Sequence, residues 1–328
     1  MLLLGSVSTA VLGGAACSGS GGPDPAPSPA EPVFPVTVPH TYGSTVVKTE
    51  PRRIVVVGYT EQDALLALGI APIATTLWFR EEPYGVWPWA VDELGDAKPE
   101  VLDSADGLPL ERIKALKPDL ILGTNAGLTQ EDYDALTAIA LTIPSSGAYG
   151  VTTFEPWQTQ TVLVGQAVGR EAEAQRLTEA LTQRVADTAA AHPQFADVPA
   201  FFLQVPYDDG SAVVYPPGLA TGFLTDLGFT IPDGLEEFVS KEDGLAYLEP
   251  GDLDLLNRAQ VLVFAGEEGE TEDELTGIAA IRELDAVKAG RAVYADEVLT
   301  GAIYFSSILS TPYVLDRLVP ELARVLPG

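Results

Sequence analysis

The sequence predicts an α/β fold of two three-layer lobes, each with a mainly parallel sheet, joined by one long α-helix. Two observations carry this prediction. Strand and helix patterns alternate on both sides of the chain centre, and a run of about 35 helix-favouring residues separates the two alternating halves. The chain of 328 residues is 46% hydrophobic, enough for one or two cores. We expect lobes at residues 33–152 and 193–328, with the connecting helix over residues 153–192.

The first half begins with a short β-hairpin over residues 36–47, after which strands and helices alternate. Residues 54–57 are apolar throughout, as expected for a strand buried on both faces. The turn after this strand lacks GxGxxG, so the sequence gives no support for a dinucleotide fold. The further elements expected are helix 61–68, strand 70–75, helix 110–116, strand 119–122, helix 129–139 and strand 141–143.

A single long helix is predicted over residues 155–191. Pro156 falls in its first turn, where a missing N–H costs little, and His192-Pro193 ends it. A helix of this length is on the order of 50 Å long, more than one small domain needs. Because no heptad repeat is sustained, we predict a rigid helix between lobes in preference to a coiled-coil arm. Apolar residues recur at helical spacing at Val162, Ala167, Leu177, Leu181 and Val185.

The second half repeats the alternation of the first. In open α/β sheets, ligands bind beyond the carboxyl ends of the strands, where the two lobes would face each other. The expected elements are strand 200–205, a helix near 219–227, helix 251–257, strand 260–264, a helical stretch 273–284, strand 292–295 and an amphipathic helix 313–325.

The composition excludes several classes of function. Eighteen Lys and Arg against 47 Asp and Glu give a formal charge of −29, which repels nucleic-acid backbones and anionic lipid headgroups. One cysteine permits no intrachain disulfide, and two histidines leave little for a zinc or manganese site. No Ser/His/Asp order, P-loop or pair of catalytic carboxylates stands out, so a binding protein is favoured over an enzyme, and no cofactor is predicted.

The N-terminal stretch has the pattern of an export signal. Residues 2–16 are apolar and small, and they precede Cys17 and a Pro/Ser/Gly-rich segment. Small residues directly before a lone cysteine resemble a bacterial lipoprotein signal, in which the cysteine is lipidated. We expect a signal over residues 1–17, a lipid on Cys17 and a flexible tether over residues 18–32. The alternative is a free thiol in a disordered tail.

Several stretches, in order along the chain from Pro51, resemble the iron-siderophore and vitamin B12 group of substrate-binding proteins of ABC importers. They are PRRIVVVGYTEQDALLALGIAPIATT, LERIKALKPDLILG, GQAVGREAEAQRL, LAYLEPGDLDLLNRAQVLVFAG, and LDAVKAGRAVYAD with SILSTPYVLDRLVPEL. The resemblance implies a monomer that captures a ligand in a cleft between two lobes. It also implies lipid anchoring and delivery to an ABC permease with its ATPase. In this family one acid on each lobe docks on the permease; the matching positions are Glu111 and either Asp252 or Glu249.

A siderophore complex is bulky and partly apolar, so its site needs aromatic walls and a few donors. Two of the candidates given next, Trp87 and Trp89, could equally well pack in the core instead of contacting the ligand. The candidate ligand-binding residues are Tyr59, Trp78, Phe79, Arg80, Trp87, Trp89, Tyr149, Tyr207, Tyr215 and Tyr304, the last followed by Phe305.

Charge favours one class of siderophore. Residues 193–240 contain no Lys or Arg, while Asp208 and Asp209 fall in a loop expected at the cleft. Arg80 is therefore almost the only cationic side chain expected at the ligand site. A triply anionic ferric catecholate would need several cationic partners. We therefore predict a neutral or cationic ferric hydroxamate, bound by Arg80 and tyrosine hydroxyls. Heme or a corrinoid on the same fold is the alternative, with a tyrosine or His192 as axial ligand.

Overall fold

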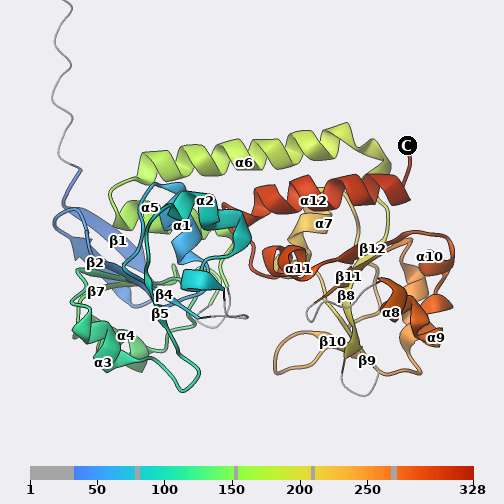
Figure 1. Cartoon of the computed structure of the whole chain (residues 1–328), viewed down its shortest axis with the longest axis horizontal. Helices are drawn as coiled ribbons and strands as arrows, with labels where there is room; N and C mark the ends of the chain where they lie inside the picture. The colour runs from blue at the N-terminus through green and yellow to red at the C-terminus, as the bar shows by residue number, and fades with distance from the viewer. Residues whose placement is uncertain (1–32, 78–81, 151–153, 208–210, 267–271) are drawn as a thin grey trace, which may run out of the picture. The chain divides into compact units, whose positions relative to one another are not determined.

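The structure is a computed structural model that describes residues 33–77, 82–150, 154–207, 211–266 and 272–328 (Figure 1). Residues 34–328 form one unit and contain two five-stranded sheets, so the α/β class and the two mainly parallel sheets predicted from the sequence are confirmed. We call residues 34–150 the first lobe and residues 193–328 the second lobe.

The sheet of the first lobe is parallel throughout, with strand order β5-β4-β3-β6-β7. Chain order reverses between β3 and β6, so the turns after these two strands lie where open α/β sheets bind ligands. The strands are β3 (Ile54–Val56), β4 (Ala74–Thr76), β5 (Glu100–Leu102), β6 (Leu120–Gly123) and β7 (Leu141–Pro144). Around them lie hairpin β1 (Val36–His40) and β2 (Gly43–Val47), helices α1 (Glu61–Ala67), α2 (Val91–Leu94), α3 (Leu110–Ala115) and α4 (Gln130–Thr137), and short 3-10 turns η1 (Pro83–Gly85) and η2 (Pro88–Ala90).

The sheet of the second lobe is mixed, with strand order β10-β9-β8-β11-β12. Strands β8, β11 and β12 are parallel, and β9 runs antiparallel to both of its neighbours. The strands are β8 (Ala200–Tyr207), β9 (Ser211–Val214), β10 (Ala246–Leu248), β11 (Val261–Ala265) and β12 (Ala292–Ala295). The helices are α7 (Gly222–Asp226), α8 (Glu272–Gly277), α9 (Ala279–Arg282), α10 (Asp285–Lys288), α11 (Glu297–Tyr304) and α12 (Ser310–Val325), with 3-10 turns η3 (Pro193–Phe195), η5 (Leu219–Thr221) and η6 (Leu253–Arg258).

The long central helix is broken, which corrects the prediction of one continuous helix over residues 155–191. Helix α5 (Trp157–Ala167) ends before Gly169, which has φ +70°, and α6 (Glu171–Ala191) begins after it. A positive φ favours glycine, which commonly ends helices. A Cβ at Gly165 would lie 2.4 Å from the Ala174 Cβ, so the close packing of α5 on α6 requires a glycine there. The connecting helix is α6 alone, about 31 Å long at 1.5 Å per residue.

Smaller differences from the predicted elements concern short segments. The predicted helix 251–257 is the 3-10 turn η6, and the helical stretch 273–284 is divided between α8 and α9 at Ile278, whose ψ is 117°. Strand β4 begins at Ala74 and not at residue 70. The sequence prediction did not include β5, β9, β10, α2, α10 or α11, each of at most eight residues.

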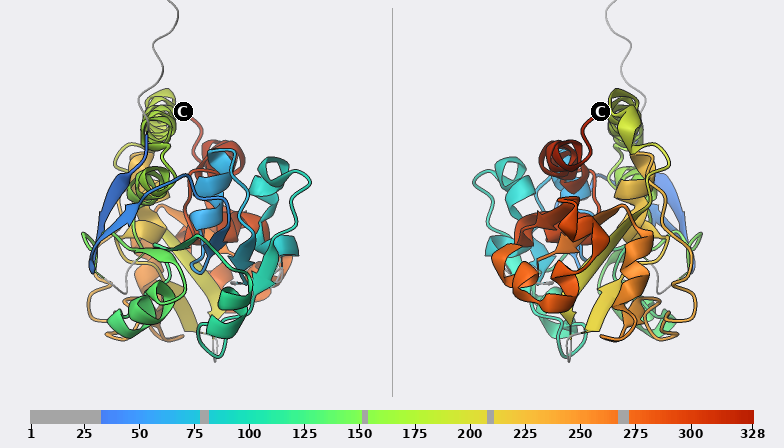
Figure 2. Two further views of the ribbon diagram at one scale, coloured as in Figure 1. Left: turned by 90° about the vertical axis from the view of Figure 1, so that its left-hand side faces the viewer. Right: turned by 90° about the vertical axis from the view of Figure 1, so that its right-hand side faces the viewer.

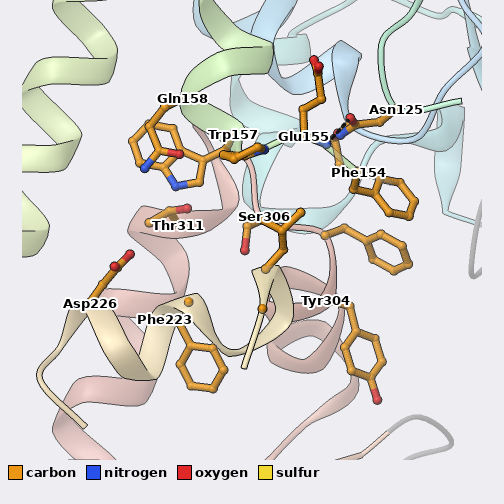
Figure 3. Close-up of a pocket in the computed structure, with 16 residues that line it drawn as sticks. Asn125, Phe154, Glu155, Trp157, Gln158, Phe223, Asp226, Tyr304, Ser306 and Thr311 are labelled. Carbon is orange, nitrogen blue, oxygen red and sulfur yellow. Dashed lines mark hydrogen bonds between the residues drawn. The ribbon is translucent and has the colours of Figure 1, made fainter. Parts of the chain in front are cut away.

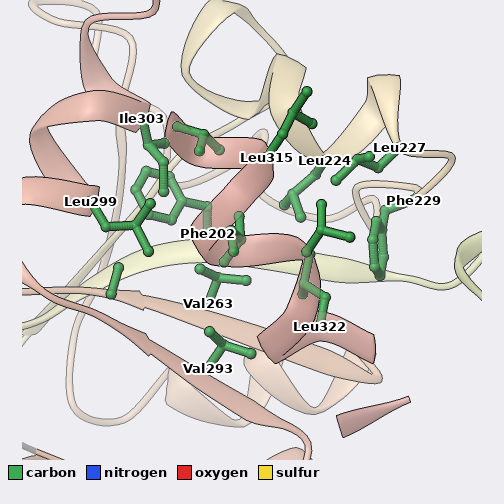
Figure 4. Packing of buried hydrophobic residues seen from close by; sticks show 14 of the residues in the cluster. Phe202, Leu224, Leu227, Phe229, Val263, Val293, Leu299, Ile303, Leu315 and Leu322 are labelled. Atoms are coloured by element: carbon green, nitrogen blue, oxygen red, sulfur yellow. The ribbon is translucent and has the colours of Figure 1, made fainter. Parts of the chain in front are cut away.

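Helix α6 packs against the hydrophobic cores of both lobes. Ala174 belongs to the first-lobe core, which contains β3, β6 and α1 residues, and Leu181 belongs to the main second-lobe core. Leu177 lies between them and contacts both cores. In the second lobe, α11 and α12 cover β8, β11 and β12, with side chains such as Phe202, Val263 and Leu322 closing the space (Figure 4). This buried apolar contact holds both lobes to one helix.

Candidate functional site

A cavity of about 230 Å³ lies between the two lobes (Figure 3). Its wall has three parts: the turns after β3 and β6 in the first lobe, the start of α5, and the α7 and α11–α12 segments of the second lobe. We call this cavity the interlobe pocket. It is the place where the topology of the first sheet predicts a ligand.

The first-lobe wall of the interlobe pocket is formed by Thr60, after β3, and Asn125, after β6. The Asn125 side-chain amide donates to Thr60 Oγ1 at 2.8 Å, and its oxygen accepts from the Glu155 backbone N–H at 3.1 Å. Gln160 of α5 donates to Thr60 Oγ1 at 2.7 Å. These bonds fix both side chains before any ligand arrives.

A buried carboxylate, Glu61, supports this wall from behind. It accepts hydrogen bonds from the backbone N–H of Asn125 at 2.8 Å and of Thr60 at 3.1 Å, and from the Thr124 hydroxyl at 3.2 Å. Gly58 leaves the space that the carboxylate occupies, because a Cβ there would lie 2.2 Å from Glu61 Oε1. Burial raises the pKa of Glu61, and the backbone hydrogen bonds oppose that rise.

The second-lobe wall is largely aromatic. Phe305 and Tyr304 come from the end of α11, and Phe154 from the segment before α5 faces them. The rings of Phe154 and Phe305 meet edge to face at 6.2 Å between centroids, and Tyr59 lies 5.9 Å from Phe154 and 6.4 Å from Phe305. Phe223 of α7 adds a further ring to the lining. Such a wall suits a bulky, partly apolar ligand.

Polar side chains occupy another part of the lining. In Figure 3, Gln158, Thr311 and Asp226 lie on the side of the interlobe pocket away from Phe154 and Tyr304. Desolvation at the pocket edge raises the pKa of Asp226, although the residue as a whole keeps contact with solvent. Among the described residues that line the pocket there is no Lys or Arg, and the two ionisable acids are Glu155 and Asp226.

A second polar contact joins the lobes outside the pocket. Asp63 of α1 accepts hydrogen bonds from Trp89 Nε1 at 2.8 Å and from the hydroxyl of Ser307, before α12, at 2.5 Å. Ser307 Oγ in turn accepts from the backbone N–H of Ser310 at 2.8 Å. Burial raises the pKa of Asp63 to about 6, against the lowering effect of these two bonds.

Trp87 and Trp89 belong to this contact between lobes and not to the pocket lining. Their rings stack at 4.9 Å, and Trp87 is 1% exposed. The Trp87 ring lies so close to α11 that a Cβ at Gly301 would be 2.7 Å from it. Trp89 packs 6.2 Å from Tyr313 of α12. Trp87 is thus buried by its packing against α11 and does not line the interlobe pocket.

Of the other sequence candidates, Tyr304 lines the interlobe pocket and Tyr59 lies beside its aromatic wall. Tyr215 packs behind Tyr304 at 5.2 Å and Tyr149 is 45% exposed; neither is part of the lining. Tyr207 is the last residue of β8. Trp78, Phe79, Arg80, Asp208, Asp209 and Cys17 lie outside the described residues.

The remaining candidates lie apart from the pocket. His192 stacks on Phe195 at 5.0 Å and contacts the Thr188 carbonyl at 2.9 Å, so it ends α6 and does not line the pocket. Glu111, in the first turn of α3, is exposed, as are Glu249 and Asp252 just before η6. All three acids are accessible to a partner.

Sequence reasoning missed several lining residues, and only some of them had a signal that could have revealed them. Thr60 lies in the turn after β3 and Asn125 in the turn after β6, so the rule for parallel sheets could have found them. Gln158, Asp226 and Thr311 lie on helices whose ends reach the pocket only after the lobes pack, and their spacing in the sequence gives no sign of this.

The fold and this site define a two-lobed solute-binding protein with its ligand site between the lobes. A family model described as "Periplasmic binding protein" matches residues 54–299, and the chain belongs to this family. The family is one of binding proteins and not of enzymes. In the part of the chain that the structure describes, no helix combines the length and the apolar composition needed to cross a bilayer.

Solved structures and curated proteins agree with this assignment. A periplasmic solute binding protein from Mycobacterium smegmatis is 40% identical, with a TM-score of 0.81 over 89% of this chain and 98% of that one. PiaA of Streptococcus pneumoniae, crystallised with ferrichrome, is 25% identical, with a TM-score of 0.70 over 89% and 98%. The probable siderophore-binding lipoprotein YfiY of Bacillus subtilis is 26% identical over 291 residues, 85% of each chain.

Proposed function

We propose that this protein captures a ferric siderophore of the hydroxamate type in the interlobe pocket and delivers it to an ABC permease. The observation that carries the proposal is the lining itself. It combines an aromatic wall, a pre-formed polar wall and, among the described residues, no Lys or Arg. YfiY is named as siderophore-binding and PiaA was crystallised with ferrichrome, which supports the same class of ligand.

The charge of the lining favours hydroxamate over catecholate. A ferric tris-hydroxamate centre is neutral, because three deprotonated hydroxamates balance Fe³⁺, whereas a ferric tris-catecholate carries three negative charges. Glu155 and Asp226 would repel the latter, and charge-assisted bonds to cations are what anionic ligands require. Within the proposal, Tyr304 and Arg80 donate hydrogen bonds to hydroxamate oxygens.

The proposed place of action is the outer face of the cell membrane. Both curated relatives are named as lipoproteins, in agreement with a lipid on Cys17. Delivery requires a permease, and the exposed acids Glu111, Glu249 and Asp252 are the proposed docking residues.

Quenching of tryptophan fluorescence tests the ligand class, because Trp157 lines the interlobe pocket. We expect saturable quenching by ferrioxamine B at submicromolar concentration, and none by ferric enterobactin or heme over the same range. Quenching by the catecholate or heme alone would contradict the hydroxamate assignment. If none of the three quenched, the proposed ligand would be wrong.

Docking is tested with Glu111→Ala. Because Glu111 lies on the surface of α3 away from the pocket lining, the affinity for ferrioxamine B should not change, whereas siderophore-dependent uptake of ⁵⁵Fe by cells should fall severalfold. Unchanged uptake would remove Glu111 from the docking surface.

A further inference from the structure

The polar end of the interlobe pocket consists of Asp226, Gln158 and Thr311. None of their three side chains makes a hydrogen bond to another residue within the described part of the chain. The aromatic wall lies on the other side of the pocket in Figure 3. The pocket is therefore divided into an aromatic part and a part with unused polar atoms.

The Asp226 carboxylate has no cationic partner among the described residues. It also stands in the last turn of α7, where the backbone carbonyl ends disfavour a negative charge. Partial desolvation raises its pKa, and the side chain stays exposed at the edge of the pocket. By contrast, the Asp63 carboxylate between the lobes accepts two side-chain hydrogen bonds. No hydrogen bond or ion pair within the described residues engages the Asp226 side chain, so its carboxylate is available to a ligand.

We propose that the polar end of the interlobe pocket binds a protonated amine of the ligand, with Asp226 as the residue that selects for it. An ammonium group carries three N–H donors and no acceptor. The Asp226 carboxylate, the Gln158 amide oxygen and the Thr311 hydroxyl oxygen are three acceptors on one side of the pocket. The inference rests on the proposed function, and it narrows the ligand class to ferric hydroxamates with a free amine.

The selection follows from charge and from the cost of leaving Asp226 without a partner. A neutral ligand that fills the pocket removes water from the carboxylate without supplying a charged donor in its place. An ammonium replaces that water with a charge-assisted hydrogen bond. The net charge of −29 adds a long-range attraction for cationic complexes, which salt reduces.

Two probes with the same iron centre test the inference. Ferrioxamine B has a terminal ammonium and a charge of +1, and N-acetyl-ferrioxamine B has an amide in its place and no charge. We expect the wild-type protein to bind the N-acetyl complex about tenfold more weakly, a difference of about 1.4 kcal/mol. Asp226→Asn should reduce this preference to within about twofold, mainly by weakening the binding of ferrioxamine B.

Asp92→Asn is the matched control, since it removes one exposed carboxylate from α2, outside the pocket lining. It should keep the tenfold preference, so that a change in total charge is separated from a change in the site. Thr311→Val should lower the preference for ferrioxamine B over N-acetyl-ferrioxamine B while leaving the Asp226 carboxylate in place. Folding of each variant is checked by circular dichroism.

The outcomes separate the inference from the proposed function. If the wild-type protein bound both probes equally, hydroxamate capture would stand and the amine site would be overturned. If the preference persisted in Asp226→Asn, its assignment to Asp226 would be overturned. Failure to bind either probe would overturn the proposed function, and with it the inference built on it.

Discussion

The two sides of the interlobe pocket are built in opposite ways. On the first lobe, every polar side chain at the wall is held by another: Asn125 and Thr60 bond to each other, and Glu61 holds their backbone. On the second lobe, the wall is made of rings and of polar groups such as Asp226 that have no partner within the described residues. Within the proposed function, the first lobe therefore supplies a fixed surface, and the second lobe supplies the contacts that select a ligand.

The largest expected effect comes from removing the support of the first-lobe wall. Glu61→Leu keeps much of the volume but leaves the N–H groups of Thr60 and Asn125 and the Thr124 hydroxyl without their acceptor. Since an unsatisfied buried donor costs 1–3 kcal/mol, the free energy of unfolding should fall by about 4 kcal/mol. Urea unfolding measures this free energy. In Glu61→Gln it should fall by about half as much as in Glu61→Leu, because one amide oxygen remains as an acceptor.

The matched variant on the opposite wall is Phe305→Ala. Because Phe305 is partly exposed at the pocket, the free energy of unfolding should fall by no more than about 1 kcal/mol. The affinity for ferrioxamine B should fall about tenfold. Equal losses of stability in Glu61→Leu and Phe305→Ala would refute the contrast between the two walls.

A smaller and pH-dependent effect is expected where the two lobes touch. The pKa of Asp63 is about 6 in the folded protein, against an ordinary value of 3.8, because burial disfavours its charge. Between these values the folded state keeps a proton that the unfolded state has lost. The contribution of Asp63 to the free energy of unfolding is therefore largest below about pH 4. It declines as the pH rises to about 6, by up to about 3 kcal/mol.

Asp63→Asn removes this titration, so its stability relative to the wild-type protein should improve between pH 4 and pH 7. Urea unfolding of both proteins at several pH values measures the difference. A difference that stays constant across this range would show that Asp63 does not titrate as the structure indicates.

The fold could be predicted well from the sequence wherever burial decides the structure. Strands such as Ile54–Val56 and Ala292–Ala295 are buried on both faces, so their apolar runs identify them without knowledge of the partner strands. Strands β9 and β10 pair with each other at the edge of the second sheet and were missed because they are only four and three residues long, although β9 is buried throughout. The break at Gly169 had a signal, a glycine before a charged helix start, which the length of the helical pattern outweighed.

The site was harder to predict because the same residue types serve packing and binding. Trp87 and Trp89 have the aromatic character of ligand contacts, yet stacking and the hydrogen bond to Asp63 place them between the lobes. Tyr304 was predicted as a residue that follows a strand; in the structure it is the last residue of α11, the helix after β12. The role proposed for Asp226 depends on its neighbours, and only the tertiary structure shows that none of the described residues lining the pocket is a Lys or Arg.

The double contact of Leu177 sets a limit on how this chain can be divided. Because one side chain of α6 completes two cores, a cut on either side of this helix would leave one half with an apolar surface open to water. Helix α6 is thus a packed part of both cores and not a linker. A fragment that carries a single lobe would therefore need α6 to cover the apolar surface of its core.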